Sequence, residues 1–207
     1  MPARRAVIFD VGRVLVDWEI RFLYERLIPE GEALDAFVRD VVTPEWHFQH
    51  DLGRPFAETS AELSAQYPQH AELIAQFGPR FNETNQAAIP GMPELLAELD
   101  SAGVPLFAIT NFSGEFFPPF RVKYPGMFDR FRDIVVSGDE KMIKPDPAIY
   151  RLALDRFGLR ADESVFVDDN ADNIAGAAAL GIHAILFTDE PALRAELREL
   201  GFPLGFG

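Results

Sequence analysis

The chain has 207 residues, and its 33 Asp and Glu against 19 Lys and Arg give a formal net charge of -14 at pH 7. This acidic balance disfavours nucleic acids and anionic membrane surfaces as partners, although a local lysine and a divalent cation can still hold a small anion in one cleft. Hydrophobic residues make up 48% of the chain, which excludes a disordered protein. Since the sequence has no Cys, disulfides, thiolate nucleophiles and cysteine-ligated zinc are excluded as well.

The first apolar run, Ala6–Phe9, meets Asp10 too early to form the core of a signal peptide. No uninterrupted apolar stretch approaches the roughly 20 residues that a membrane-spanning helix needs. We therefore expect a soluble, cytoplasmic protein, a monomer or homodimer, without a membrane or nucleic-acid partner.

Five short apolar runs, rich in β-branched and aromatic residues, have the pattern of strands that are buried on both faces. They are residues 6–9, 106–109, 134–136, 165–167 and 184–187. Helical patterns closed by Gly lie at residues 93–102, 147–157, 171–180 and 191–200. This alternation predicts an α/β fold, a doubly wound (Rossmann-like) parallel sheet that binds its ligands at the carboxyl ends of the strands.

The stretch between the first two predicted strands breaks this alternation. Its helical patterns cover residues 20–27, 33–41, 56–66 and 72–76, and it shows no convincing buried strand. We expect an α-helical cap domain over residues 18–88, inserted into a core made of residues 1–17 and 89–207. Its place beside the predicted site suits a lid that closes over substrate; the alternative is a subdomain that only covers one edge of the sheet.

Polar groups lie after four of the predicted strands, and the topology brings all four to one edge of the sheet. Two of these groups together hold three carboxylates, which repel one another unless a cation is bound, and hard oxygen ligands of this kind suit Mg²⁺. The other two offer hydroxyl, amide and ammonium donors to an anion. In chain order the residues are Asp10, Thr110 with Asn111, Lys144, and Asp168 with Asp169.

Taken singly, these residues have plainer interpretations. Lys144 alone has the pattern of a solvated surface lysine, and residues 168–170 alone could simply cap the helix that follows. Their convergence on one edge is what indicates a site.

Four motifs carry a family resemblance. They are Phe-Asp-Val-Gly-Arg-Val-Leu-Val at residues 9–16, Ile-Thr-Asn at 109–111, Ile-Lys-Pro-Asp at 143–146 and Phe-Val-Asp-Asp-Asn-Ala-Asp-Asn at 166–173. In order and character they resemble the haloacid dehalogenase superfamily, over nearly the whole chain from about Ala6 to Phe202. Most similar is the subfamily of phosphatases with a helical cap after the first motif. It includes alpha-glucose-1-phosphate phosphatases and the phosphatase domain of soluble epoxide hydrolases.

The resemblance implies a Mg²⁺-dependent phosphatase for small phosphorylated metabolites, sugar phosphates among them. In that mechanism the catalytic Asp10 attacks phosphorus, and water then hydrolyses the aspartyl phosphate. The implied magnesium ligands are Asp10, the backbone carbonyl of Gly12, Asp169 and Asp168, the last directly or through water. The groups implied to hold the transferring phosphoryl oxygens are Thr110, Asn111 and the catalytic Lys144.

One position departs from the family pattern. Most phosphatases of this superfamily have a second Asp two residues after the nucleophile, which protonates the leaving group and then activates water; here that residue is Gly12. A missing general acid or base typically costs about 10²- to 10⁴-fold in rate. We therefore expect either a preference for leaving groups of low pKa or sugar 1-phosphates, or a substitute acid. The candidates are Asp17, if a flap folds it back, and the cap residues His47, His50 and Asp51.

Other functions stay open. A 2-haloacid dehalogenase uses the same nucleophile without a metal, but these enzymes usually have Tyr in place of Gly12 and small polar residues in place of Asp168 and Asp169. A catalytically silent member would bind a phosphorylated metabolite or a protein partner as a regulator; Gly12 supports this function, and the retained nucleophile Asp10 speaks against it. A sugar-phosphate mutase is disfavoured, because it depends more strongly on the missing acid.

Overall fold

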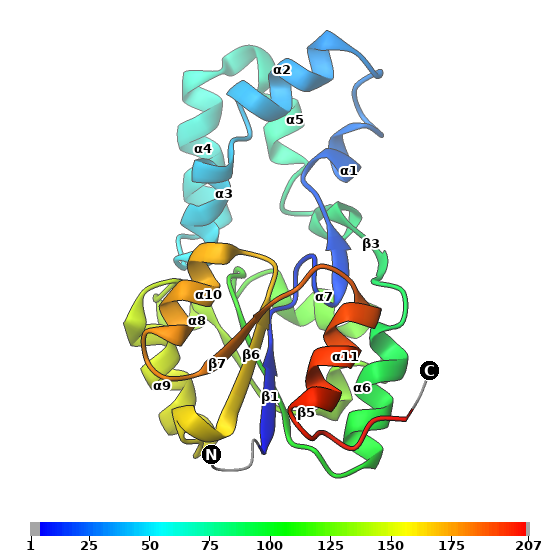
Figure 1. Cartoon of the computed structure of the whole chain (residues 1–207). Helices are drawn as coiled ribbons and strands as arrows, with labels where there is room; N and C mark the ends of the chain where they lie inside the picture. Colours follow the sequence, from blue (N-terminus) through cyan, green and yellow to red (C-terminus); the bar gives the residue numbers. More distant parts are fainter. Residues whose placement is uncertain (1–4, 206–207) are drawn as a thin grey trace.

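The computed structural model describes residues 5–205, which form a core built on a sheet and a group of helices above it (Figure 1). The central sheet has five strands in the order β5-β4-β1-β6-β7, all paired in parallel. They are β1 (Ala6–Phe9), β4 (Leu106–Thr110), β5 (Phe131–Val136), β6 (Ser164–Asp168) and β7 (His183–Leu186). Each overlaps one predicted strand, so the predicted doubly wound α/β fold is confirmed.

Alternation along the strands divides the core between the two faces of the sheet. Val7 and Phe9 of β1 pack with helices α6 and α11 on one face, whereas Ala6 and Ile8 pack with α9 and α10 on the other. Because helices cover both faces, the carboxyl ends of the strands are the part of the sheet that remains open to ligands. The four helices are α6 (Met92–Ser101), α9 (Pro147–Phe157), α10 (Ala171–Ala178) and α11 (Glu190–Glu199).

The cap helices lie above the carboxyl ends of the strands (Figure 1). They are α1 (Arg21–Tyr24), α2 (Glu32–Asp40), α3 (Pro44–Asp51), α4 (Phe56–Gln66) and α5 (Ala71–Ala75). All but α3 fall on predicted helical patterns. Helix α3 buries polar as well as apolar side chains, so it lacks the apolar stripe by which an amphipathic helix is recognised. Its buried residues are Trp46, His47, His50 and Asp51.

An antiparallel two-stranded ribbon carries the chain into and out of the cap. It pairs β2 (Val16–Trp18) with β3 (Asn85–Ala88), and the predicted domain boundaries at 17/18 and 88/89 fall within it and at its end. The sequence did not predict this ribbon, because β3 is mostly exposed and therefore has no buried-strand pattern. Residues 1–4 and 206–207 of the predicted core lie outside the described residues.

A second connection between cap and core lies where the end of α3 meets α8 (Ser137–Glu140), on the side away from the ribbon (Figure 1). Gly53 has a positive φ of 85°, and a Cβ added there would lie 2.5 Å from the carbonyl oxygen of Gly138. The Ser137 hydroxyl donates a hydrogen bond of 2.6 Å to the backbone carbonyl of Asp51. The backbones therefore approach more closely than any side chain at position 53 would permit.

The remaining elements are short. They are α7 (Phe117–Lys123) and the 3₁₀ turns Pro68–His70, Phe81–Thr84, Phe128–Arg130 and Ala161–Glu163. Across residues 5–205, every helix is too short or too polar to cross a membrane.

Candidate active site

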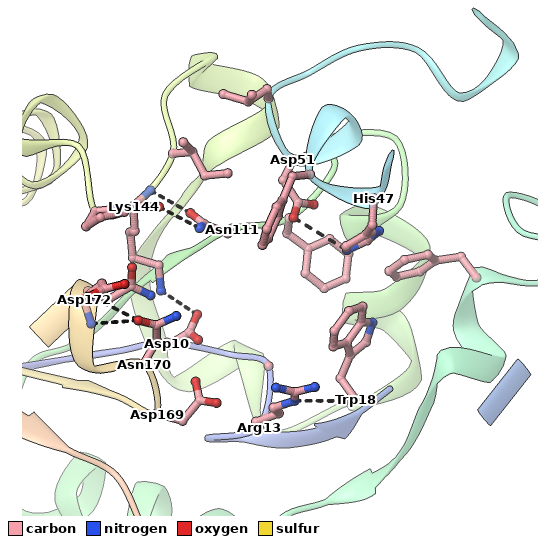
Figure 2. A pocket seen from close by; sticks show the side chains of 18 residues that line it. Asp10, Arg13, Trp18, His47, Asp51, Asn111, Lys144, Asp169, Asn170 and Asp172 are labelled. Atoms are coloured by element: carbon pink, nitrogen blue, oxygen red, sulfur yellow. Dashed lines mark hydrogen bonds and ion pairs between the residues drawn. The ribbon is translucent and has the colours of Figure 1, made fainter. Parts of the chain in front are cut away.

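The predicted polar residues meet at the carboxyl edge of the sheet, beneath the cap. Asp10 directly follows β1, Thr110 ends β4 and Asp168 ends β6, while Lys144 lies in the loop between α8 and α9. At this edge, core and cap residues together line a cavity of about 560 Å³ (Figure 2). Its core wall includes Asp10, Gly12, Asn111, Lys144 and Asp169.

Lys144 lies at the centre of the polar cluster. Its Nζ is 2.8 Å from Asp10 Oδ1 and 2.6 Å from Asp168 Oδ2, and its side chain is buried. Burial alone lowers the pKa of a lysine, but the charges of Asp10 and Asp168 together outweigh it and raise the pKa of Lys144. The residue is therefore a buried ammonium with a fixed position, not a solvated surface lysine.

The Lys144 loop is held from the β4 side. Asn111 Nδ2 donates to the Lys144 carbonyl at 3.1 Å, and the Lys144 N–H donates to Asn111 Oδ1 at 2.9 Å. Both the nitrogen and the oxygen of the Asn111 amide thus bind the Lys144 backbone, so this side chain, which also lines the cavity, helps to place Lys144. Thr110 is buried at the end of β4 and is not part of the cavity wall in the described structure.

The adjacent residues Asp168 and Asp169 have different surroundings. Asp168 is fully buried and accepts hydrogen bonds from Lys144 Nζ, from the Asn170 N–H at 2.8 Å and from Asn173 Nδ2 at 3.0 Å to each oxygen. Asp169 borders the cavity. Helix α10 is capped by the Asn170 side chain, so neither aspartate is needed as the cap. Asp168 therefore holds the ammonium, and Asp169 faces the space where a ligand can bind.

The acidic cluster carries more negative charge than one lysine balances. Carboxylate oxygens of Asp10, Asp168 and Asp169 lie within 4.8 Å of one another. Burial raises the pKa of Asp10 to about 7, with Lys144 opposing it, and burial together with the charge of Asp168 raises the pKa of Asp169. Oxygen ligands at this spacing suit a hard divalent cation. The residues present therefore fit Mg²⁺.

The position of the missing acid is open space. Gly12 lines the cavity, and a Cβ built on it would have no atom within 4 Å. The flap residue Asp17 lies on β2 and is not part of the cavity wall in residues 5–205. The charge of Asp17 acts on Tyr124 instead. Burial is the larger cause and the charge of Asp17 the smaller one that together raise the pKa of Tyr124 to about 12. The flap therefore does not bring Asp17 to the nucleophile.

The cap supplies two polar residues to the cavity. His47 and Asp51 of α3 project across the cavity from Asp10 and Asp169 (Figure 2). The His47 ring also stacks on Trp18 of the ribbon, with centroids 5.0 Å apart. The third cap candidate, His50, instead pairs its Nε2 with the Thr59 hydroxyl at 2.7 Å inside the cap, and it does not line the cavity.

Sequence reasoning missed most of the cap-side wall. The residues are Arg13, Trp18, Leu52, Phe81 and Phe112. In a chain with 19 Phe, no single aromatic residue is marked as a pocket residue. Arg13 had one usable signal, its place directly after Gly12 in the nucleophile motif. In the structure its φ of 58° is unusual for a non-glycine residue.

Comparisons with curated proteins agree with this geometry. The chain is 32% identical to mouse acyl-CoA dehydrogenase family member 10 over 98% of its own length, and it covers 20% of that longer protein. It is 29% identical to a sesquiterpene phosphatase from Aspergillus oryzae, covering 95% of this chain and 96% of the relative. It is 30% identical to a phosphoglycolate phosphatase from Yersinia pseudotuberculosis, covering 90% of this chain and 82% of that protein.

Solved structures share the fold. A haloacid dehalogenase family enzyme from Bacteroides thetaiotaomicron, in a magnesium complex, superposes with a TM-score of 0.72 at 18% identity, over 95% of this chain and 99% of that one. The L-2-haloacid dehalogenase of Xanthobacter autotrophicus superposes with a TM-score of 0.63 at 21% identity, over 97% and 85%. The family model for haloacid dehalogenase-like hydrolases matches residues 4–181. The chain therefore belongs to the haloacid dehalogenase-like hydrolase family, and it is a hydrolase.

Proposed function

We propose that this hydrolase is a Mg²⁺-dependent phosphatase that cleaves small phosphomonoesters through an aspartyl phosphate on Asp10. The observation that carries the proposal is one buried ammonium, Lys144, between Asp10 and Asp168, with Asp169 beside them and facing the cavity. An oxygen nucleophile, a fixed positive charge and a carboxylate that can hold a metal are what phosphoryl transfer requires. The phosphatase names of two relatives support it.

The reaction has two steps on Asp10. First, a carboxylate oxygen of Asp10 forms a bond to phosphorus while the bond between phosphorus and the leaving oxygen breaks, and that oxygen takes up a proton. Water then attacks the phosphorus of the aspartyl phosphate, loses a proton, and releases inorganic phosphate with the Asp10 carboxylate restored. Lys144 stabilises the charge on the phosphoryl oxygens in both steps, because its ammonium is held 2.8 Å from the nucleophile.

Bound Mg²⁺ would supply the positive charge that lets a phosphate dianion approach the acidic cluster. The residues that would hold it are Asp10, Asp169 and the backbone carbonyl of Gly12, which all belong to cavity-lining residues. Asp168 belongs to the same cluster, but Lys144 and Asn173 already use its oxygens, so its part is to hold the lysine. The Bacteroides thetaiotaomicron enzyme of the same fold was solved with magnesium and inorganic phosphate, which supports a metal at this position.

The cap-side wall favours substrates with an apolar alcohol. Trp18, Phe48, Leu52, Phe81 and Phe112 give this wall a mostly apolar surface. A sugar needs hydrogen-bond partners for several hydroxyl groups, whereas an aromatic or aliphatic alcohol needs contact area. We therefore expect aryl and isoprenoid-like alkyl phosphates to be better substrates than sugar phosphates. The relative named as a sesquiterpene phosphatase agrees with this order.

The dehalogenase alternative is less well supported by the same cavity. A 2-haloacid carries a carboxylate, and Asp169 would face it with a second negative charge in a site where Lys144 is already shared by two aspartates. Such like charges repel strongly in a partly buried site. A metal-dependent phosphatase makes use of Asp169, and a metal-free dehalogenase does not.

The test is phosphate release from aryl, alkyl and sugar phosphates, with Mg²⁺ or with EDTA, for the wild type and Asp10→Asn. We expect release that depends on Mg²⁺ and is lost in Asp10→Asn, and a phosphorylated Asp10 after rapid acid quenching, detected by mass spectrometry. Halide release from a 2-haloacid in EDTA would instead support the dehalogenase. Absence of turnover with every substrate would support a silent binder.

A further inference from the structure

Two side chains of cap helix α3 border the cavity with unused hydrogen-bonding atoms. Asp51 and His47 are 2% and 6% exposed. Asp51 Oδ2 lies 3.6 Å from His47 Nε2, which is beyond hydrogen-bond distance. Asp51 Oδ1 and His47 Nδ1 have no hydrogen-bond partner within residues 5–205. Because buried polar atoms are nearly always paired, these unpaired atoms indicate that hydrogen bonds do not fix either side chain to the rest of the fold, which leaves both residues available to a ligand in the cavity that they line.

The surroundings of Asp51 keep its carboxyl protonated at neutral pH. Burial raises the pKa of Asp51 to about 8, while the charge of Lys144 lowers it. Burial lowers the pKa of His47 to about 4, so this ring is neutral and does not take the proton from Asp51. The titratable groups around Asp51 are His47 from its own helix, Lys144 from the loop before α9 and, on the other walls of the cavity, Asp10, Arg13, Asp169 and Asp172. A neutral carboxylic acid on a cavity wall is a proton donor.

Hydrogen bonds of Ser137 hold the backbone of Asp51 against the core. The Ser137 hydroxyl donates to the Asp51 carbonyl at 2.6 Å and accepts from the Phe112 N–H at 2.9 Å. Phe112 directly follows Asn111, whose amide places Lys144. One serine thus ties the end of the cap helix to the loop that positions the catalytic lysine.

The core leaves room for a group supplied by the cap. Gly12 borders the same cavity, and a side chain there would meet no atom within 4 Å of its Cβ. Asp17, the acid next in the chain, does not line the cavity. Within the described residues, Asp51 is therefore a protonated acid that lies across the cavity from Asp10 (Figure 2).

The geometry points to Asp51 as the general acid and base of the reaction, supplied by the cap in place of the residue missing at Gly12. This inference rests on the proposed phosphatase function. In the first step the Asp51 carboxyl gives its proton to the leaving oxygen as the bond from that oxygen to phosphorus breaks. In the second step the Asp51 carboxylate takes a proton from the attacking water, which regenerates the acid while phosphate leaves Asp10. Phosphomonoesters of alcohols with a high pKa should therefore also be hydrolysed, whereas Gly12 alone predicts a preference for leaving groups of low pKa.

The experiment measures kcat/KM over a series of phosphomonoesters whose leaving groups run from dinitrophenol to simple alkanols. In the wild type we expect kcat/KM to depend only weakly on the pKa of the leaving group. This result tests the proposal without any variant. Asp51→Asn, which is nearly isosteric with the neutral acid, should lower kcat/KM for alkyl phosphates by about 10²- to 10⁴-fold. The dinitrophenyl ester should stay near the wild-type rate, because dinitrophenolate leaves without a proton. That retained activity also shows that the variant is folded.

Three further variants complete the design. Asp40→Asn makes the same change on the exposed cap surface and should leave the whole series unchanged. Asp17→Asn represents the competing flap acid. Gly12→Asp added to Asp51→Asn fills the open space at Gly12 with a new acid and should recover at least about tenfold for alkyl phosphates.

The assignment would be overturned by equal losses for dinitrophenyl and alkyl esters in Asp51→Asn, by a steep leaving-group dependence in the wild type, or by a selective loss of alkyl phosphates in Asp17→Asn. Failure of the phosphatase proposal gives a different result. In that case the dinitrophenyl ester itself is not hydrolysed by the wild type above the Asp10→Asn background.

Discussion

Asp168 Oδ2 lies 2.6 Å from Lys144 Nζ, and both side chains are buried, so this ion pair is closed off from solvent. Asparagine at position 168 would place an amide donor among the buried donors of Lys144, Asn170 and Asn173, and leaving a buried donor unpaired costs about 1 to 3 kcal/mol, or more for a charged group. We expect Asp168→Asn to lower the free energy of unfolding by an amount in this range, measured by urea denaturation. Asp162→Asn removes an aspartate that pairs with Arg160 at 2.8 Å on the exposed surface, and it should change stability little. Equal effects of the two substitutions would contradict this account of Asp168.

Asp169 should control the metal rather than the fold. It borders the cavity within the acidic cluster, whereas the oxygens of Asp168 are taken by Lys144 and Asn173. We expect Asp169→Asn to raise the Mg²⁺ concentration for half-maximal activity by at least about tenfold, since losing even an indirect ligand has effects of that size. Asp172→Asn, in the same cavity wall but outside the cluster, should shift it less. A Mg²⁺ titration that is the same for Asp169→Asn and wild type would disprove this role.

The contact between Gly53 and Gly138 should be required for the cap to seat. A Cβ at residue 53 would lie 2.5 Å from the Gly138 carbonyl oxygen, and the φ of 85° adds strain of about 1 to 2 kcal/mol for a non-glycine residue. Gly103→Ala is the matched control, because its φ is 78° and its Cβ would meet nothing within 4 Å. We expect both variants to lose stability, but only Gly53→Ala to lose kcat/KM as well. Similar activity of the two would show that the close contact is dispensable.

The buried carboxyl of Asp51 should make folding pH-dependent. Its pKa rises from 3.8 to about 8, so above pH 3.8 the folded state retains a proton that the unfolded state has lost. The contribution of this group to the free energy of unfolding is fully present below about pH 3.8. It falls as the pH rises toward 8, by up to about 1.4 kcal/mol per pH unit. Urea denaturation between about pH 5 and 8 should therefore show a smaller fall for Asp51→Asn than for the wild type. Parallel curves would mean that Asp51 is ionised in the folded protein.

The strands and the polar strand ends could be predicted because their signals are local. A short apolar run ended by Asp10 or by Thr110 and Asn111 needs no tertiary information, and parallel topology then brings such ends together. The predicted residues Asp10, Lys144 and Asp169 accordingly meet at one cavity.

The role of each residue within the site could not be predicted from the sequence. Whether Asp168 or Asp169 faces the cavity depends on the pairing with Lys144, which lies 24 residues away in the chain. The sequence marks Asn111 as a donor to phosphate, but it cannot show that the same amide binds the backbone of Lys144, 33 residues away in the chain. Helix α3 escaped detection because burial of its His47 and Asp51 depends on the core beneath it, which no helical periodicity in residues 44–51 records.

Ion pairs between side chains do not hold the cap helices onto the core within the described residues. Among residues 5–205, the ion pairs of the cap helices stay within the cap and its ribbon, and none of them reaches the core strands or helices. The close approach of Gly53 to Gly138 joins cap and core, as do hydrogen bonds from the Ser137 hydroxyl to the Asp51 carbonyl and from the Phe56 N–H to the Glu115 carboxylate. Lys123 of α7 also donates to the backbone carbonyls of Asn82 and Asn85, next to the ribbon. Steric fit and a neutral hydrogen bond are not screened by dissolved ions, unlike surface ion pairs. Closure of this active site should therefore depend on ionic strength less than the binding of the phosphate itself does, because charged side chains contribute only the Glu115 and Lys123 hydrogen bonds among these contacts.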